Sequence, residues 1–240
     1  MFEITTVLAA LPRLARGMGL TVALSAAILV LGALIALPLA VVRTESRRFL
    51  QRAIDGYVLV FRGTPALVQI ALLYYGIAQF EAVRQSPVWI VVRDPFWCCV
   101  IALGLNTGAY TTQLLAGALR TVPAGMLGAA RALGMTRWQV VVHVRLPIGL
   151  RLALPAYANE VILLVKATSL ASTVTLLELT GMARVIVNDT YAPYEIFTAA
   201  AVFYLAMTYS LAGLFRVLER RFRVGAGSAA HSPSGETALR

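Results

Sequence analysis

Residues 125–147 read GMLGAARALGMTRWQVVVHVRLP, and this stretch decides how the rest of the chain is interpreted. It holds three arginines and no acidic residue, and it lies between two apolar stretches. Two adjacent alanines, Ala129 and Ala130, are followed by Gly134, and a Leu-Pro pair closes the stretch. A chain that only has to stand in a bilayer does not need such a segment, so we interpret it as a docking surface for a cytoplasmic partner. The residues alone leave a second interpretation open, in which an amphipathic helix lies on the membrane surface.

The composition indicates a membrane protein. Of the 240 residues, 59% are hydrophobic and 13% are charged, whereas soluble domains carry about 25% charged residues. The net charge is +10, and all but one of the 21 basic residues are arginines. A basic chain can indicate nucleic-acid binding. Here the arginines fall between apolar runs, so we expect them to orient the protein in a membrane, with no nucleic acid as partner.

Long apolar runs predict an all-α integral membrane protein with five transmembrane helices, because a bilayer core takes about 20 apolar residues in a helix. The predicted spans are residues 20–42, 58–80, 95–119, 152–177 and 196–215.

The two ends of the chain differ from the transmembrane domain, which we place at residues 17–224. Residues 1–16 carry apolar side chains at helical spacing and predict a short interfacial helix. Residues 225–240 are small and polar and predict a disordered tail.

Basic residues predict the orientation, because they gather on the cytoplasmic side of membrane proteins. With five spans, the loop after the first span, the loop at residues 120–151 and the C-terminal end share one face. That face carries Arg43, Arg47, Arg48, Arg52, Arg120, Arg131, Arg137, Arg145, Arg151, Arg216, Arg220, Arg221, Arg223 and Arg240. The opposite face carries only Arg13, Arg16, Arg84, Arg93 and Arg184. We therefore predict an outer N-terminus and an inner C-terminus.

The fourth predicted span carries two charges, Glu160 and Lys166. A charge at bilayer depth costs about 2.5–3.5 kcal/mol on insertion scales, so such residues are candidates for function. Six residues separate the two, about 120° around a helix, whereas Asn159 and Lys166 share a face. We expect Glu160, Asn159 and Lys166 to line a translocation path, with Glu160 attracting a cationic or zwitterionic substrate. The alternative is that each charge pairs with a neighbouring helix or a sister subunit.

The second predicted span begins with a possible gate. Gly63 and Pro65 would loosen or bend the helix start next to Arg62, which suits a moving gate. Gln69 lies deeper and is a candidate for lining the path. Arg62 has an alternative role, in which it reaches the lipid headgroups or bonds loop carbonyls.

Several motifs together carry a resemblance to a known family. They are FRGTP at residues 61–65, LNTGAY at 105–110, ANEVILLVKATSL at 158–170, and the opening stretch. Over about residues 17–220 the chain resembles permease subunits of ATP-binding-cassette importers for polar amino acids, of the histidine/lysine/arginine/ornithine or octopine/nopaline type. The family's coupling loop reads Glu-Ala-Ala, then Gly, then Leu-Pro, and Gly128 here stands in place of the Glu.

The resemblance implies a type I importer permease fold and a set of partners. Residues 120–151 would form the cytoplasmic coupling loop that docks on a dimer of ATPase subunits. A second permease subunit, a periplasmic amino-acid-binding protein and membrane lipid would complete the assembly in a bacterial inner membrane, and Gly128 favours a heterodimer. The coupling residues implied by the match are Ala129, Ala130, Arg131, Gly134, Leu146 and Pro147.

The expected function is transport of polar, basic amino acids or opines by alternating access, without enzymatic activity in this chain. No GxxxxGK[ST] loop or metal-ligand spacing is present, so ATP and magnesium are expected on the partner ATPase. The sequence has no HExxH motif, no paired intramembrane aspartates and no Ser/His pair at bilayer depth. It therefore gives no indication of an intramembrane enzyme. A stand-alone ion channel or secondary transporter is the alternative, although it would not need the basic cytoplasmic loop.

Overall fold

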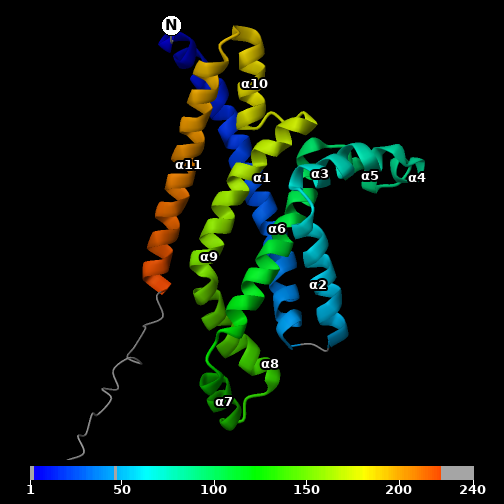
Figure 1. The fold of residues 1–240 in the computed structure, drawn as a ribbon, viewed down its shortest axis with the longest axis vertical. Helices are drawn as coiled ribbons and strands as arrows, with labels where there is room; N and C mark the ends of the chain where they lie inside the picture. Colours follow the sequence, from blue (N-terminus) through cyan, green and yellow to red (C-terminus); the bar gives the residue numbers. More distant parts are fainter. Residues whose placement is uncertain (1–2, 46–47, 223–240) are drawn as a thin grey trace, which may run out of the picture.

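The computed structural model describes residues 3–45 and 48–222, and every regular element within them is a helix. Four long helices run along the molecule (Figure 1): α1 (Ile4–Glu45), α6 (Pro95–Arg120), α9 (Leu146–Ala167) and α11 (Pro193–Phe222). The all-α class is confirmed. The predicted tail, together with Arg47, Arg223 and Arg240, lies outside the described residues. The shorter elements are α2 (Arg48–Gly63), α3 (Ala66–Ala71), η1 (Leu72–Gly76), η2 (Ile77–Gln79), α4 (Glu81–Arg84), α5 (Val88–Val92), α7 (Ala124–Ala132), α8 (Arg137–Val140), η3 (Val141–Arg145), η4 (Thr168–Val174) and α10 (Leu179–Thr190).

The start of the chain differs from the prediction of a separate interfacial helix at residues 1–16. Helix α1 runs for 42 residues without a break. Ala10 and Leu14, both in its first part, are buried in a cluster with residues of α10 and α11. Part of the apolar spacing at the start of the chain therefore belongs to a buried helix face, whereas Ile4 and Leu8 are exposed. The helix continues directly into the predicted span.

The predicted second span, residues 58–80, is not one straight helix. Helix α2 begins at Arg48 and ends at Gly63, and the helical segment Ala66–Gln79 then continues at 98° to it. Pro65 precedes α3 and donates no backbone N–H. The Gln69 amide bridges the bend, since its Nε2 donates to the Phe61 carbonyl oxygen at 2.9 Å and to Thr64 Oγ1 at 2.7 Å. The elements α3 to α5 consequently project sideways as an arm (Figure 1).

Three described helical segments are long and apolar enough to cross a membrane: Ile4–Glu45, Arg137–Val174 and Pro193–Phe222. The bent pair of α2 with Ala66–Gln79 would make a fourth. Helix α6 has 26 residues, or about 39 Å at 1.5 Å per residue, so its length also suffices. It carries polar side chains such as Asn106 and Gln113, which lower its mean hydropathy. The count of five spans therefore stays a prediction.

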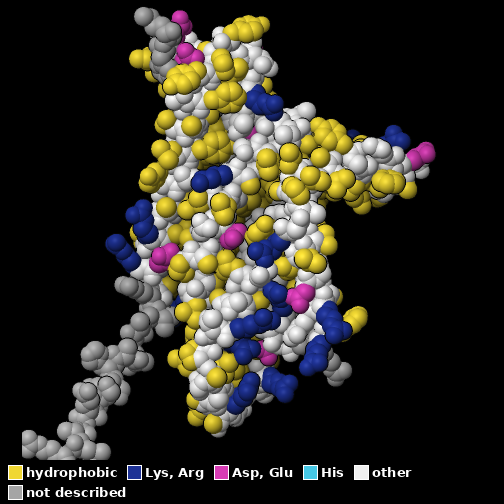
Figure 2. Space-filling model, viewed as in Figure 1, with side chains coloured by type: hydrophobic (Ala, Val, Ile, Leu, Met, Phe, Trp, Pro, Cys, Tyr) yellow, Lys and Arg dark blue, Asp and Glu magenta, His cyan; other side chains and the backbone are white. Residues whose placement is uncertain are grey.

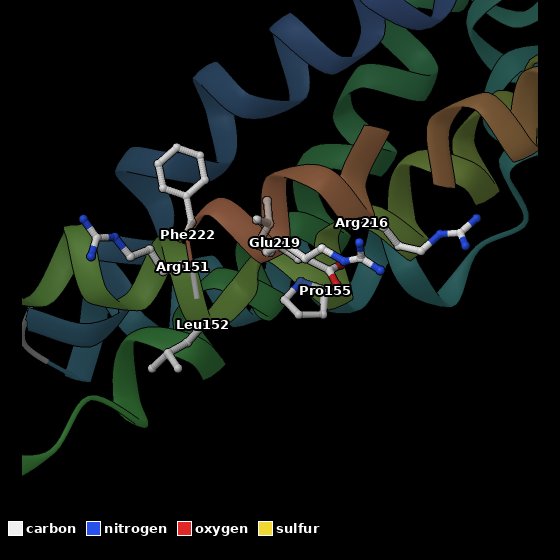
Figure 3. Close-up of a pocket in the computed structure, with 8 residues that line it drawn as sticks. Arg151, Leu152, Pro155, Arg216, Glu219 and Phe222 are labelled. Atoms are coloured by element: carbon white, nitrogen blue, oxygen red, sulfur yellow. The ribbon is translucent and has the colours of Figure 1, made fainter. Parts of the chain in front are cut away.

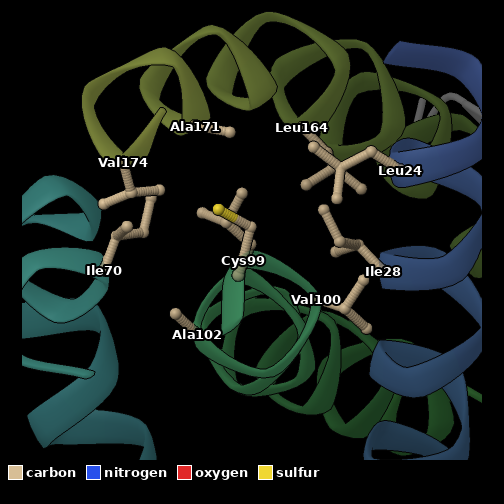
Figure 4. Packing of buried hydrophobic residues seen from close by; sticks show 10 residues of the cluster. Leu24, Ile28, Ile70, Cys99, Val100, Ala102, Leu164, Ala171 and Val174 are labelled. Atoms are coloured by element: carbon tan, nitrogen blue, oxygen red, sulfur yellow. The ribbon is translucent and has the colours of Figure 1, made fainter. Parts of the chain in front are cut away.

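The core joins α1, α3, α6, α9 and η4 in one apolar cluster (Figure 4). Leu24 and Ile28 of α1 are fully buried there, as is Cys99 of α6. Close packing of α1 on α6 depends on small residues, as is common between membrane helices. At Gly104 of α6 a Cβ would lie 2.6 Å from Leu31 Cδ2, so a larger residue would require the Leu31 side chain of α1 to shift.

Helix α10 begins directly after Glu178, a fully buried acidic residue that is not among the predicted site residues. The Glu178 carboxylate accepts hydrogen bonds from the backbone N–H of Thr180 at 2.9 Å and of Gly181 at 2.8 Å. Tyr204 of α11 donates its hydroxyl to the same carboxylate at 2.9 Å. Burial raises the pKa of Glu178, and these hydrogen bonds oppose that rise. Glu178 thus caps α10 and ties it to α11.

Candidate functional site

Glu160 of α9 lies in a cavity of about 200 Å³ between α9 and α6. The α6 wall of this cavity includes Asn106, Thr107 and Tyr110, which are polar side chains spaced along that helix. Glu160 itself is half-buried. A carboxylate facing an amide and two hydroxyl side chains can hold the cationic group of a small polar molecule by charge and hydrogen bonds. The apolar wall consists of Leu103, Leu163, Leu164 and Ala167.

Arg62 of α2 lies beside this cavity. Its guanidinium stands 4.7 Å from the centroid of the Tyr110 ring, and its Nη1 donates to the Gln113 side chain. Since α2 begins at Arg48, Arg62 lies about 21 Å along the helix from its first residue. The structure therefore favours contact with the cavity over a reach to the cytoplasmic headgroups.

The other two residues predicted to line the path from α9 are placed differently. Asn159 and Lys166 are exposed and do not line the cavity that holds Glu160. They sit on the open side of α9, as their spacing of seven residues predicts for one helical face.

Gln69 and the predicted gate residues belong to the bend rather than to the cavity wall. Besides its bonds across the bend, Gln69 accepts a hydrogen bond from Asn106 Nδ2 at 3.1 Å through its Oε1. Gly63 and Pro65 form the corner directly after Arg62. The hydrogen bond between Gln69 and Asn106 links the corner to the cavity wall. A gating role for the corner stays a prediction.

The coupling segment, residues 120–151, contains the short helices α7, α8 and η3 at one end of the molecule, and its last residues begin α9 (Figure 1). Ala130 of α7 and Val140 of α8 are buried against each other in a small cluster of their own with Val122 and Leu127. Gly134 makes the turn between the helices with a φ of +82°, a conformation that favours glycine.

The outer side of this segment is apolar and exposed. Leu133 is 85% exposed and Trp138 is 67% exposed. The predicted docking residues lie in the same segment, with Ala129, Ala130 and Arg131 in α7 and Leu146 and Pro147 at the start of α9. Large apolar side chains left open on a folded segment are typical of an interaction surface.

Positive charge gathers at the same end of the molecule. Figure 2 shows lysine and arginine side chains concentrated over the lower half of the view, where α7 and α8 lie. A pocket of about 410 Å³ between the start of α9 and the end of α11 adds Arg151, Arg216 and Arg220, with Glu219 among them (Figure 3). Basic residues at one end of apolar helices are the pattern of a cytoplasmic face.

Apolar helices, a charged cavity between two of them and a folded segment projecting from the basic end define a pore-forming subunit of a membrane transporter. The chain belongs to the family described as binding-protein-dependent transport system inner membrane component, which matches residues 28–224. It is therefore a permease subunit and not itself an enzyme.

Curated relatives agree with this assignment. The octopine transport system permease protein OccM of Rhizobium meliloti is 43% identical over 203 residues, which cover 84% of this chain and 83% of that protein. The histidine/lysine/arginine/ornithine transport system permease protein HisM of Salmonella typhimurium (strain LT2) is 43% identical over 207 residues, covering 86% and 88%. The nopaline transport system permease protein NocM of Agrobacterium fabrum is 39% identical over 218 residues, covering 90% of each.

Solved structures show the same fold. An amino acid ATP-binding-cassette transporter crystallised with histidines superposes with a TM-score of 0.81 at 28% identity, covering 92% of this chain and 99% of that one. An inward-facing MetNI methionine transporter superposes with a TM-score of 0.75 at 20% identity, covering 88% and 96%, and it shows the fold alone. The expected type I importer permease fold is thus confirmed.

Proposed function

We propose that this chain forms part of the translocation pore of an importer in the bacterial inner membrane and moves a polar, basic amino acid or an opine inward. The observation that carries this proposal is Glu160, a half-buried carboxylate that lines a cavity together with polar side chains of α6. OccM is an octopine, NocM a nopaline and HisM a histidine/lysine/arginine/ornithine permease, which supports the same substrate class. Transport would proceed by alternating access, driven by separate ATPase subunits that bind ATP and magnesium.

Accumulation of labelled substrate in proteoliposomes tests this function. The chain, its ATPase and its sister permease would be reconstituted with the periplasmic binding protein outside and ATP inside. We expect ATP-dependent accumulation of at least one of arginine, ornithine, lysine, histidine and octopine. Flux of the same strength without ATP or binding protein would instead support a stand-alone channel or secondary transporter.

The proposed topology has five spans, an outer N-terminus and an inner C-terminus. The two ends of the molecule support it, since α10 lies opposite α7 and α8 (Figure 1) and the basic residues gather at the α7–α8 end. In a chain with Cys98 and Cys99 replaced by alanine, a cysteine at Arg184 should react with an impermeant maleimide added outside intact cells. A cysteine at Arg137 should react only after the cells are opened. The reverse pattern would invert the topology.

The exposed apolar surface of the coupling segment would dock on the ATPase dimer. Replacing Leu133 and Trp138 together by aspartate puts two charges into that contact, so we expect at least a tenfold loss of ATPase copurification, equivalent to about 1.4 kcal/mol or more. The matched control is Leu8→Asp, an exposed leucine at the other end of the molecule. Equal copurification in the double variant and the control would place the ATPase contact elsewhere.

A second permease subunit would complete the pore. The projecting arm supports this, because it exposes large apolar side chains that the described part of the chain does not cover. We propose a heterodimer, in which the sister subunit carries the coupling-loop Glu that Gly128 lacks. A Cβ at Gly128 would meet nothing within 4 Å, so the fold itself does not require glycine there. The exposed arm residues include Leu67, Val68, Leu72, Tyr75, Phe80, Val88, Ile90 and Val91.

A further inference from the structure

The last turn of α1 contacts both ends of the coupling segment. Arg145, at the end of η3, forms an ion pair with Glu45, the final residue of α1. The two side chains are only 18% and 30% exposed, so solvent screens the pair less than a surface pair. Arg120, at the other end of the segment, reaches the backbone carbonyl oxygen of Arg43 at 3.5 Å. A displacement of α7 and α8 therefore acts on Glu45 through Arg145, while the end of α6, from which α7 follows, contacts Arg43.

A second ion pair continues from α1 to α2. The Arg43 guanidinium holds Asp55 Oδ1 with two nitrogens, Nε at 2.8 Å and Nη2 at 2.7 Å. The Arg43 side chain is 15% exposed, so it lies between the helices rather than in open solvent. Asp55 and Arg62 are seven residues apart on α2 and therefore share one face of that helix.

This face of α2 lies next to the cavity that holds Glu160. Arg43, Asp55 and Arg62 line one continuous hollow of about 390 Å³ together with Tyr110 and Gln113. Tyr110 also belongs to the wall of the Glu160 cavity. One series of contacts thus runs from the coupling segment to the residue beside Glu160.

We propose that Glu45 and Asp55 are positioning residues that make α1, α2 and Arg62 move with the coupling segment. The relay consists of the ion pairs Arg145–Glu45 and Arg43–Asp55, and it rests on the proposed docking of an ATPase on α7 and α8. When the ATPase moves the segment, the relay shifts α2 and changes the position of Arg62 over Tyr110. Without the relay, the ATPase still hydrolyses ATP, but Arg62 no longer moves with the coupling segment.

The test uses the complete transporter in proteoliposomes and measures ATP hydrolysed per molecule of arginine imported. Glu45→Ala and Asp55→Ala should each raise this ratio about tenfold, within the range of couplings between distant sites. The charge-exchanged double variant Glu45→Arg/Arg145→Glu should return the ratio to within about threefold of the wild type. The matched control, Asp189→Ala, breaks the exposed Arg13–Asp189 pair at the other end of the molecule and should leave the ratio unchanged.

A second measurement does not depend on the substrate. Spin labels at Met126 of α7 and Leu59 of α2, both exposed, report whether the two elements move together. Their distance should stay constant in the wild type when ATP and vanadate are added, and it should change in Glu45→Ala.

The relay is overturned if the single variants match Asp189→Ala, or if the exchanged pair restores assembly but not the ratio. It is also overturned if the label distance behaves alike in wild type and Glu45→Ala. A wild-type chain that does not assemble with an ATPase would instead defeat the proposed function itself.

Discussion

Glu160→Gln is expected to lower the uptake of a cationic substrate by about tenfold to a hundredfold. A hydrogen bond to a charged group contributes about 1.5–3 kcal/mol, and each 1.4 kcal/mol is a factor of ten. The substitution keeps the shape of the side chain and removes its charge in the cavity shared with Asn106 and Tyr110. The loss should therefore fall on substrate recognition, while the ATPase still copurifies.

Initial rates over a range of substrate concentrations measure this effect in the reconstituted transporter. Glu81→Gln is the control, because Glu81 is an exposed carboxylate on the projecting arm. Unchanged apparent affinity and maximal rate in Glu160→Gln would remove Glu160 from the pathway and leave it a structural role.

Glu178→Ala is expected to destabilise the fold more than any other single substitution considered. The change leaves the N–H groups of Thr180 and Gly181 and the hydroxyl of Tyr204 without their common acceptor. A buried donor left unpaired costs about 1–3 kcal/mol. The three donors together should therefore lower the free energy of unfolding by about 3–5 kcal/mol. The contact between α10 and α11 should loosen first, because Glu178 joins the two.

Thermal unfolding in mild detergent measures this loss, with Glu81→Ala as the matched exposed carboxylate. Glu178→Gln should fall between wild type and Glu178→Ala, since the amide keeps one acceptor oxygen but turns an N–H toward the backbone donors. A midpoint for Glu178→Ala equal to that of Glu81→Ala would show that the network contributes nothing to stability.

The long helices could be predicted because each is encoded by a continuous run of apolar residues. The predicted span 95–119 corresponds closely to α6, and the span 196–215 lies inside α11. The class of protein followed from the same runs and from the alanine-rich coupling segment, which the family match confirms.

The bend after α2 could not be predicted in the same way. Gly63 and Pro65 indicated a weakened helix, but the 98° angle depends on the Gln69 bonds to Phe61 and Thr64. Such contacts carry no periodic signal in the sequence. The same holds for Glu178, since a single acidic residue between two spans gives no sign that three donors converge on it.

The candidate site was predicted only in part. Glu160 stood out as a charge within an apolar run, and the structure places it in the cavity. Lys166 stood out for the same reason and Asn159 because it shares a face with Lys166, yet both are exposed and neither lines that cavity. The α6 residues Asn106 and Tyr110 reach the site through packing between helices distant in sequence, and their polar character alone did not assign them to it.

The central claim is that this chain is a pore subunit driven by a separate ATPase. The most direct test is a mild-detergent pull-down of the chain from its native membrane, followed by mass spectrometry of its partners. The account predicts an ATPase together with one similar permease, and an ATPase with this chain alone would indicate a homodimer. A folded preparation that brings down no ATPase would contradict the account.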